Sequence, residues 1–155
     1  MIENVFGDLA IGATRTSRGR TITETDVVHF CMLTGNWLAL HADAEFAKST
    51  RYGQRVVQGS LVFSIANAML PFDDGVVESF YGVDRLRFHQ PTFIGDTLRA
   101  RTQVVELRDR DADSGIATSL LEAINQRDET VLSCRFSLVV RRARRQPDGE
   151  ARHSA

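Results

Sequence analysis

Residues whose types could take part in an acid–base site lie in the middle of the chain. His41 lies five positions after the amide Asn36, and Gly59 follows further along the chain. Histidine titrates near neutral pH and can exchange a proton with a reacting group. A glycine at a helix start leaves unpaired backbone N–H groups open to developing negative charge. The pattern predicts proton transfer beside an oxyanion site, provided that His41 and Gly59 share a cavity. The alternative is a loop histidine that only bonds a backbone carbonyl.

The segment before His41 predicts a capped helix. Thr23 is the expected N-cap, and Asp26 three positions later completes a capping box. Apolar residues recur at helical spacing over residues 27–33, and Gly35 ends the pattern. A short helical turn is expected at residues 43–49. Asn36 and His41 are therefore placed in the loop after the first helix.

A second helix is expected at about residues 59–70. Its apolar residues surround the whole circumference, and Pro71 ends it. Such a helix must be wrapped by the rest of the protein. The expected strands are residues 77–89, 96–109, 115–127 and 129–142, with a polar edge strand at residues 13–22. We therefore predict an α+β fold in which a long antiparallel meander curls around a central helix.

Composition indicates a single soluble domain. The 155 residues are 43% hydrophobic and 25% charged, with a net charge of −1. No stretch approaches the roughly 18–20 apolar residues of a membrane span, and the acidic N-terminus lacks the order of a secretory signal, so a cytoplasmic location is expected. Cys31 and Cys134 lack metal-ligand spacing and are expected to be buried, reduced thiols.

The C-terminus is basic. Five arginines stand against Asp148 and Glu150 in the last fifteen residues. Nucleic-acid binding is one interpretation of this run. The absence of interleaved aromatic residues favours a solvated, disordered tail instead. We expect one domain at residues 1–142 and a tail at residues 143–155.

Three blocks of sequence resemble the MaoC-like dehydratase family, which includes the (R)-specific enoyl-CoA hydratases. They are GRTITETD (19–26) with LTGNWLALHADAEFA (33–47), YGQRVVQGSL (52–61), and RFHQPTFIGDTL (87–98). The blocks occur in the order of the family. The resemblance implies a hot dog fold, usually dimeric, that acts on acyl thioesters. Its reaction is reversible addition of water to a trans-2-enoyl thioester to give the (R)-3-hydroxyacyl product. Coenzyme A is part of the substrate, and no further cofactor or metal is implied.

The resemblance implies roles for His41 as base, Gly59 N–H as oxyanion donor, and Asn36 at a position where the family has Asp. Asparagine can orient water or fix a histidine tautomer, but it cannot accept a proton as a carboxylate does. Gln58 stands where the family often has His. Asn36 and Gln58 are predicted either to pair in the pocket or to satisfy loop backbone groups.

Further residues have weaker claims on the substrate. Gln58, Ser60, Arg55 and Arg87 are predicted to bind it, and arginine suits the phosphates of coenzyme A. Arg51 and Arg85 are candidates for the same role, and solvated faces are the alternative for all four arginines. His89 is expected to shape a turn. Two other functions stay open, namely a hot dog acyl-CoA thioesterase and a non-catalytic acyl-binding subunit of a hydratase heterodimer. The expected assembly is a homodimer or a higher homo-oligomer, without nucleic-acid or membrane partners.

Overall fold

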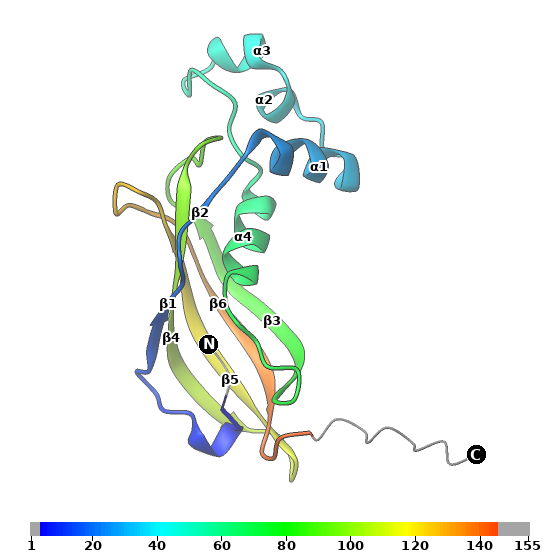
Figure 1. Ribbon diagram of the computed structural model, residues 1–155, viewed down its shortest axis with the longest axis vertical. Helices are drawn as coiled ribbons and strands as arrows, with labels where there is room; N and C mark the ends of the chain where they lie inside the picture. The colour runs from blue at the N-terminus through cyan, green and yellow to red at the C-terminus, as the bar shows by residue number, and fades with distance from the viewer. Residues whose placement is uncertain (1–3, 146–155) are drawn as a thin grey trace, which may run out of the picture.

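A six-stranded antiparallel sheet curls around helix α4 (Gly59–Ala68) in the computed structural model, which describes residues 4–145 (Figure 1). The strands are β1 (Thr14–Thr16), β2 (Arg20–Thr21), β3 (Val77–Phe88), β4 (Thr97–Asp109), β5 (Ser114–Ile124) and β6 (Thr130–Arg141). The other helices are the 3-10 turn η1 (Phe6–Asp8), α1 (Glu24–Thr34), α2 (Ala39–Ala42) and α3 (Ala44–Lys48). This arrangement confirms the predicted α+β class and the sheet around a central helix.

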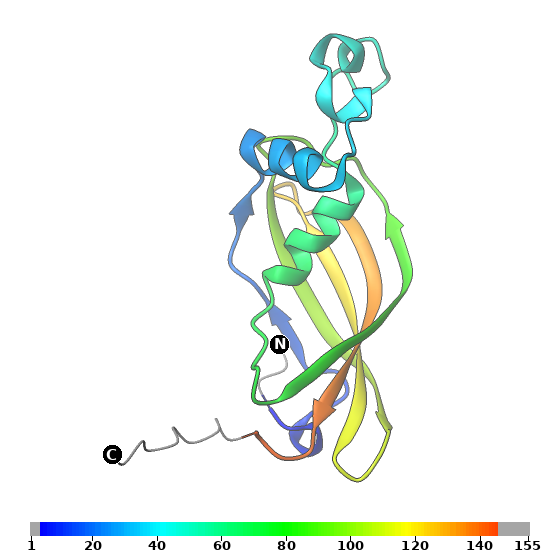
Figure 2. The same ribbon diagram turned by 90° about the vertical axis from the view of Figure 1, so that its right-hand side faces the viewer.

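The sheet order is β1-β4-β5-β6-β3, with β2 also paired to β4. Strands β4, β5 and β6 form the predicted meander, but β3 does not pair with β4. It lies beyond β6 at the edge of the sheet. The chain must therefore cross the sheet between β3 and β4, and Figure 2 shows this crossing above the start of α4. The period-two pattern predicted the strands correctly, and it carried no information about their order.

Helix α4 is covered on its sheet side only. Leu61, Val62, Ile65 and Ala66 are buried in the core, together with Leu121 of β5. The opposite stripe contains small side chains that remain exposed, namely Ser60, Ser64 and Ala68. The expectation of a helix wrapped all round is therefore wrong for the single chain. The helix is also shorter than predicted, because Met69 and Leu70 form its capping turn.

Helix α1 has the predicted capping box. The Thr23 side chain accepts from Asp26 N–H, the Asp26 carboxylate accepts from Thr23 N–H, and Gly35 ends the helix at φ 71°. Only Val27 and Cys31 of this helix are buried. Several apolar side chains of α1, α3 and the segment between α1 and α2 remain exposed, namely Met32, Leu33, Trp37, Leu38 and Phe46.

Other expectations concern the chain's ends and its thiols. The predicted edge strand over residues 13–22 forms as β1 and β2, both against β4. Cys31 and Cys134 are free and buried, as predicted, and burial raises the pKa of the Cys134 thiol to about 11.

Arg145 N–H donates to Gly75 O at 2.8 Å, so the start of the predicted tail contacts the domain. The rest of that tail, residues 146–155, lies outside the described residues.

Candidate functional site

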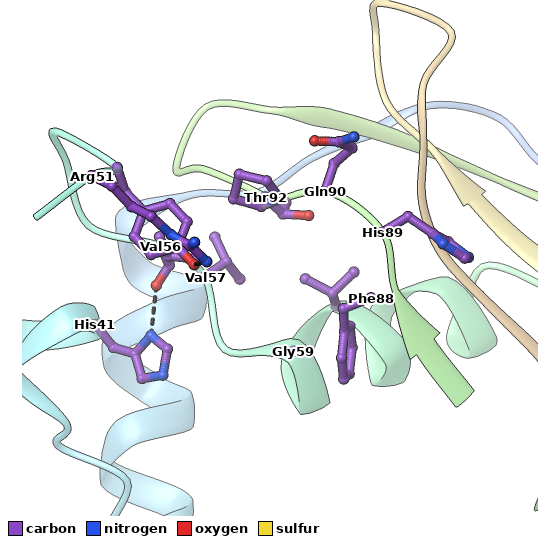
Figure 3. A pocket seen from close by; sticks show the side chains of 12 residues that line it. His41, Arg51, Val56, Val57, Gly59, Phe88, His89, Gln90 and Thr92 are labelled. Atoms are coloured by element: carbon purple, nitrogen blue, oxygen red, sulfur yellow. Dashed lines mark hydrogen bonds between the residues drawn. The ribbon is translucent and has the colours of Figure 1, made fainter. Parts of the chain in front are cut away.

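A cavity of about 520 Å³ opens where α2, the start of α4 and the β3–β4 connection meet. Its volume falls within the range of small-molecule sites, about 300–1,000 Å³. The lining residues are His41, Arg51, Tyr52, Val56, Val57, Gly59, Val62, Phe88, His89, Gln90, Pro91 and Thr92. Figure 3 shows how their side chains surround the space.

His41 lies in the one-turn helix α2 rather than in a loop as expected. Its Nδ1 lies 2.7 Å from the carbonyl oxygen of Val56 (Figure 3). A carbonyl oxygen can only accept, so Nδ1 carries the proton. In the neutral ring Nε2 then has a free lone pair and can act as a base. The carbonyl bond that was the alternative to a functional His41 is thus present, and it selects the tautomer that a base needs.

The loop that supplies this carbonyl is held at both of its ends. Val56 N–H donates to Leu40 O at 3.2 Å, which ties the loop to α2. Val57 N–H donates to Thr92 O at 2.8 Å, which ties it to the β3–β4 connection. These two bonds bring His41 and the crossing connection to the same cavity.

Gly59 is the first residue of α4, and the preceding Gln58 provides no side-chain cap. The N–H groups of a first helical turn have no intrahelical partner, and the helix dipole is positive there. A Cβ on Gly59 would lie 2.6 Å from Cζ and 2.7 Å from Cε1 of Phe88. A side chain at this position would displace the half-exposed Phe88 ring, a contact that is visible only in the structure.

The connection between β3 and β4 forms a further wall. His89 Nε2 lies 2.8 Å from Ser133 Oγ, and His89 N–H donates to Val131 O at 2.9 Å. These bonds agree with the expected role of His89 in shaping the turn. The ring also lines the cavity, so His89 is a second histidine in the site.

Arg51 and Tyr52 form the charged part of the wall. The Arg51 guanidinium donates to the Tyr52 hydroxyl at 2.8 Å, and its Cζ lies 4.9 Å from the centre of the same ring. The hydrogen bond to Tyr52 raises the pKa of Arg51, so the group stays charged. The lining contains no aspartate or glutamate. The cavity therefore combines one permanent cation, a positive helix end and two histidines.

The two predicted amides are directed to partners outside the cavity. Asn36 Oδ1 accepts from Leu38 N–H at 3.5 Å, within its own loop. Gln58 is buried, its Nε2 lies 3.0 Å from Cys31 Sγ, and its Oε1 has no hydrogen-bond partner among the described residues. Neither residue lines the cavity. A direct Asn36–Gln58 pair in the pocket is thus not formed in the single chain.

The other predicted substrate-binding residues also lie elsewhere. Ser60 is exposed, and its carbonyl accepts from the Ser64 hydroxyl. Arg55 pairs with Glu24 beside a smaller cavity of about 220 Å³. Arg87 is exposed on β3 and donates to Leu86 O at 2.8 Å. Of the seven predicted site residues, the structure brings only His41 and Gly59 to the cavity.

Several lining residues were not singled out from the sequence. Phe88, Gln90 and Thr92 belong to the block RFHQPTFIGDTL, whose resemblance to the family was the available signal. Tyr52 begins the block YGQRVVQGSL, which gave the same signal, but its contact with Arg51 is visible only in the structure.

Within residues 4–145, no group of three or more His, Cys, Asp or Glu side chains is placed to hold a metal ion. In the same part of the chain, no helix has the length and apolar character needed to cross a bilayer.

Comparison with known proteins gives one family and several similar structures. The model of the MaoC-like domain matches residues 8–125. A solved structure described as a monoamine oxidase regulatory protein from an Archaeoglobus species is 41% identical. It aligns with a TM-score of 0.85 over 93% of this chain and 96% of that one. A conserved hypothetical protein from Mycobacterium tuberculosis, described as a double hot dog fold, aligns with a TM-score of 0.77 at 24% identity over 94% of this chain and 45% of that one. The second likeness concerns the fold alone, which is the hot dog fold.

Among curated proteins, a 3-hydroxybutyryl-CoA dehydratase from Methylorubrum extorquens is 31% identical over 106 residues. The alignment covers 66% of this chain and 64% of that relative. Across the first three curated relatives, the chain spans between 29% and 64% of their length.

Proposed function

The chain belongs to the MaoC-like dehydratase family, and from that premise we propose that it adds water reversibly to a trans-2-enoyl thioester, giving an (R)-3-hydroxyacyl thioester. The observation that supports the proposal most directly is the tautomer of His41. Its Nδ1–H is held by the Val56 carbonyl, which leaves Nε2 as the base beside the start of α4. Coenzyme A or an acyl carrier is part of the substrate, and the proposed reaction uses no further cofactor.

In the proposed hydration, His41 Nε2 takes a proton from water while the oxygen of that water bonds to C3 of the enoyl group. The imidazolium is stabilised because Nδ1–H already donates to a carbonyl. One proton must then be returned to C2. Of Asn36 and His41, only His41 can carry it, since Asn36 cannot exchange a proton at neutral pH. The Nε2 atom of His89 is engaged with Ser133 Oγ. His41 therefore serves first as base and then as acid.

The thioester oxygen becomes negatively charged as water adds, and the start of α4 is the proposed site that holds it. The Gly59 N–H and the positive end of the helix favour this charge. The cavity lining contains no carboxylate that would oppose it. Loss of one such donor commonly lowers a rate about 10²–10³-fold.

The test follows two signals in one reaction. Purified protein is incubated with crotonyl-CoA and with longer enoyl-CoAs while enoyl absorbance and free thiol are recorded. Loss of absorbance without thiol release, with an (R)-configured product, is the expected result. Release of thiol indicates a thioesterase instead. Binding without either signal indicates a non-catalytic subunit.

We also propose that two copies of the chain assemble as a homodimer. Strand β3 is the last strand of the sheet, and Leu33 of α1 is 83% exposed beside other uncovered apolar side chains. Apolar patches of this kind mark protein interfaces. Sedimentation equilibrium is expected to give twice the chain mass of 17.3 kDa, and Leu33→Glu is expected to shift the protein towards the monomer. A monomeric wild-type protein would refute this assembly.

A further inference from the structure

Arg51 is a cation of the cavity wall without a carboxylate partner. Among residues 4–145, its side chain bonds Tyr52 alone, through the hydroxyl at 2.8 Å and the ring face at 4.9 Å. These two contacts restrain the guanidinium to one side of the Tyr52 ring. They leave most of its five N–H donors unused. An arginine held in this way is prepared to bind an anion.

The acidic side chains nearest in the sequence are engaged elsewhere. Asp43 accepts the N–H groups of Glu45 and Phe46 at the start of α3. Glu45 lies 2.6 Å from Lys48. The cavity lining itself contains no acid. The charge of Arg51 is therefore not neutralised by the part of the chain that the structure describes.

The loop of Arg51 is tied to the element that carries His41. The Val56 carbonyl bonds the His41 ring, and Val56 N–H donates to Leu40 of α2. Figure 3 shows Arg51 and His41 towards one end of the cavity, and Phe88 and His89 towards the other. His41 acts at the double bond of the acyl group in the proposed reaction. An anion bound by Arg51 at the same end of the cavity is therefore expected to be a carboxylate of the acyl group. The alternative anion in a coenzyme A thioester is a phosphate of coenzyme A.

We propose that Arg51 binds an anionic group of the bound thioester and so selects acyl groups that carry a carboxylate close to the double bond. This inference rests on the proposed hydratase function, and it names the class of substrate. The Arg51 side chain would form charged hydrogen bonds to the carboxylate, with Tyr52 holding it in place. Arg51 is thus a specificity-determining residue, and His41 remains the group that moves the proton.

The test compares four thioesters. Crotonyl and fumaryl groups differ in that a carboxylate replaces the terminal methyl of crotonyl. Each is presented on coenzyme A and on pantetheine, which has no phosphate. The variants are Arg51→Met, and Arg108→Met as a matched control, because Arg108 is an exposed arginine of β4 outside the cavity. The value of kcat/KM is measured for every combination.

Arg51→Met is expected to lower kcat/KM for both fumaryl thioesters about 10- to 100-fold, the size expected for a hydrogen bond to a charged group. Both crotonyl thioesters are expected to change less than about threefold, and Arg108→Met is expected to leave all four values unchanged. A loss confined to the two coenzyme A thioesters assigns the anion to a phosphate, and Arg51 is then an anion site without selecting the acyl group. Equal loss on all four substrates, or no loss on any, overturns the proposal.

A binding measurement separates this inference from the proposed reaction. Succinyl-CoA and butyryl-CoA have no double bond and cannot be hydrated, yet they differ in the same carboxylate. Calorimetric titration is expected to show that Arg51→Met weakens the binding of succinyl-CoA about 10- to 100-fold more than the binding of butyryl-CoA. If wild-type protein hydrates none of the enoyl thioesters but this difference remains, the hydratase function fails and the anion site stands. If hydration is present and the difference is absent, selection of the acyl carboxylate fails.

Discussion

Two cavities of similar volume lie at opposite ends of helix α4, and their chemistry differs. The first, of about 520 Å³, contains Gly59 and Val62 from the start of the helix. The second, of about 460 Å³, contains Met69, Leu70 and Pro71 from its end. The rest of the second lining is the β1–β2 segment, residues 15–20, which includes three arginines.

The difference lies in which backbone groups are left free. At the start of α4 the first N–H groups have no cap from Gln58, and His41 faces the same space. At the end of α4, Met69 and Leu70 N–H groups donate back to helix carbonyls, and no lining side chain titrates near neutral pH. Cavity volume therefore does not identify a reactive site. A reactive site is indicated instead by a helix start with unpaired N–H groups beside a histidine whose tautomer is fixed by a hydrogen bond.

The largest expected effect comes from removing the base. His41→Ala is expected to lower kcat for hydration of crotonyl-CoA roughly 10²–10⁴-fold, because Asn36 cannot accept the proton of water and His89 Nε2 is engaged with Ser133. Far-ultraviolet circular dichroism is expected to stay unchanged, since His41 lies in a partly exposed single turn. Full activity in this variant would contradict the assignment of the site to the start of α4.

The next effect concerns the helix start itself. Gly59→Ala places a Cβ 2.6 Å from the Phe88 ring, so the ring or the helix start must shift. We expect kcat to fall about tenfold or more, because the backbone N–H at position 59 is displaced from the thioester oxygen that it is proposed to bind. The double variant Gly59→Ala/Phe88→Ala relieves the contact and is expected to recover part of the loss. If the double variant is as impaired as the single one, crowding by Phe88 is not the cause.

A smaller effect is expected at Asn36. Its side chain bonds Leu38 N–H and does not line the cavity, so Asn36→Asp is expected to change hydration of crotonyl-CoA less than about threefold. Steady-state kinetics with the wild type alongside checks this. A large rise would show that Asn36 reaches the substrate after a movement of its loop, and that the asparagine limits the rate.

The smallest effect is expected at the other end of the helix. Arg18→Ala alters the lining of the second cavity, where no group of the proposed reaction lies. Its kcat and KM for crotonyl-CoA are expected to stay within about twofold of the wild type. A loss comparable with that of His41→Ala would show that the two ends of α4 do not differ as proposed.

Much of the fold was predictable because its signals are local. The Thr23 capping box, the Gly35 terminus and the alternation in β5 and β6 each depend on residues close in sequence. The position of β3 beside β6 was not predictable, because strand order depends on contacts between distant segments. The same crossing brings His89 and Thr92 to the cavity, so the incomplete prediction of the site follows from the missing strand order.

The sequence by itself determined most of the elements, the class of fold and two residues of the cavity, His41 and Gly59. Residue type and spacing were sufficient for the elements, since a capping box and a period of two are patterns within short segments. The resemblance of the short blocks to the family indicated His41 and Gly59. Only the tertiary structure decided that Val56 holds the His41 tautomer, that the Phe88 ring lies against Gly59, and that Gln58 turns to Cys31. Each of these is a contact between separate segments, and the packing around α4 selects it.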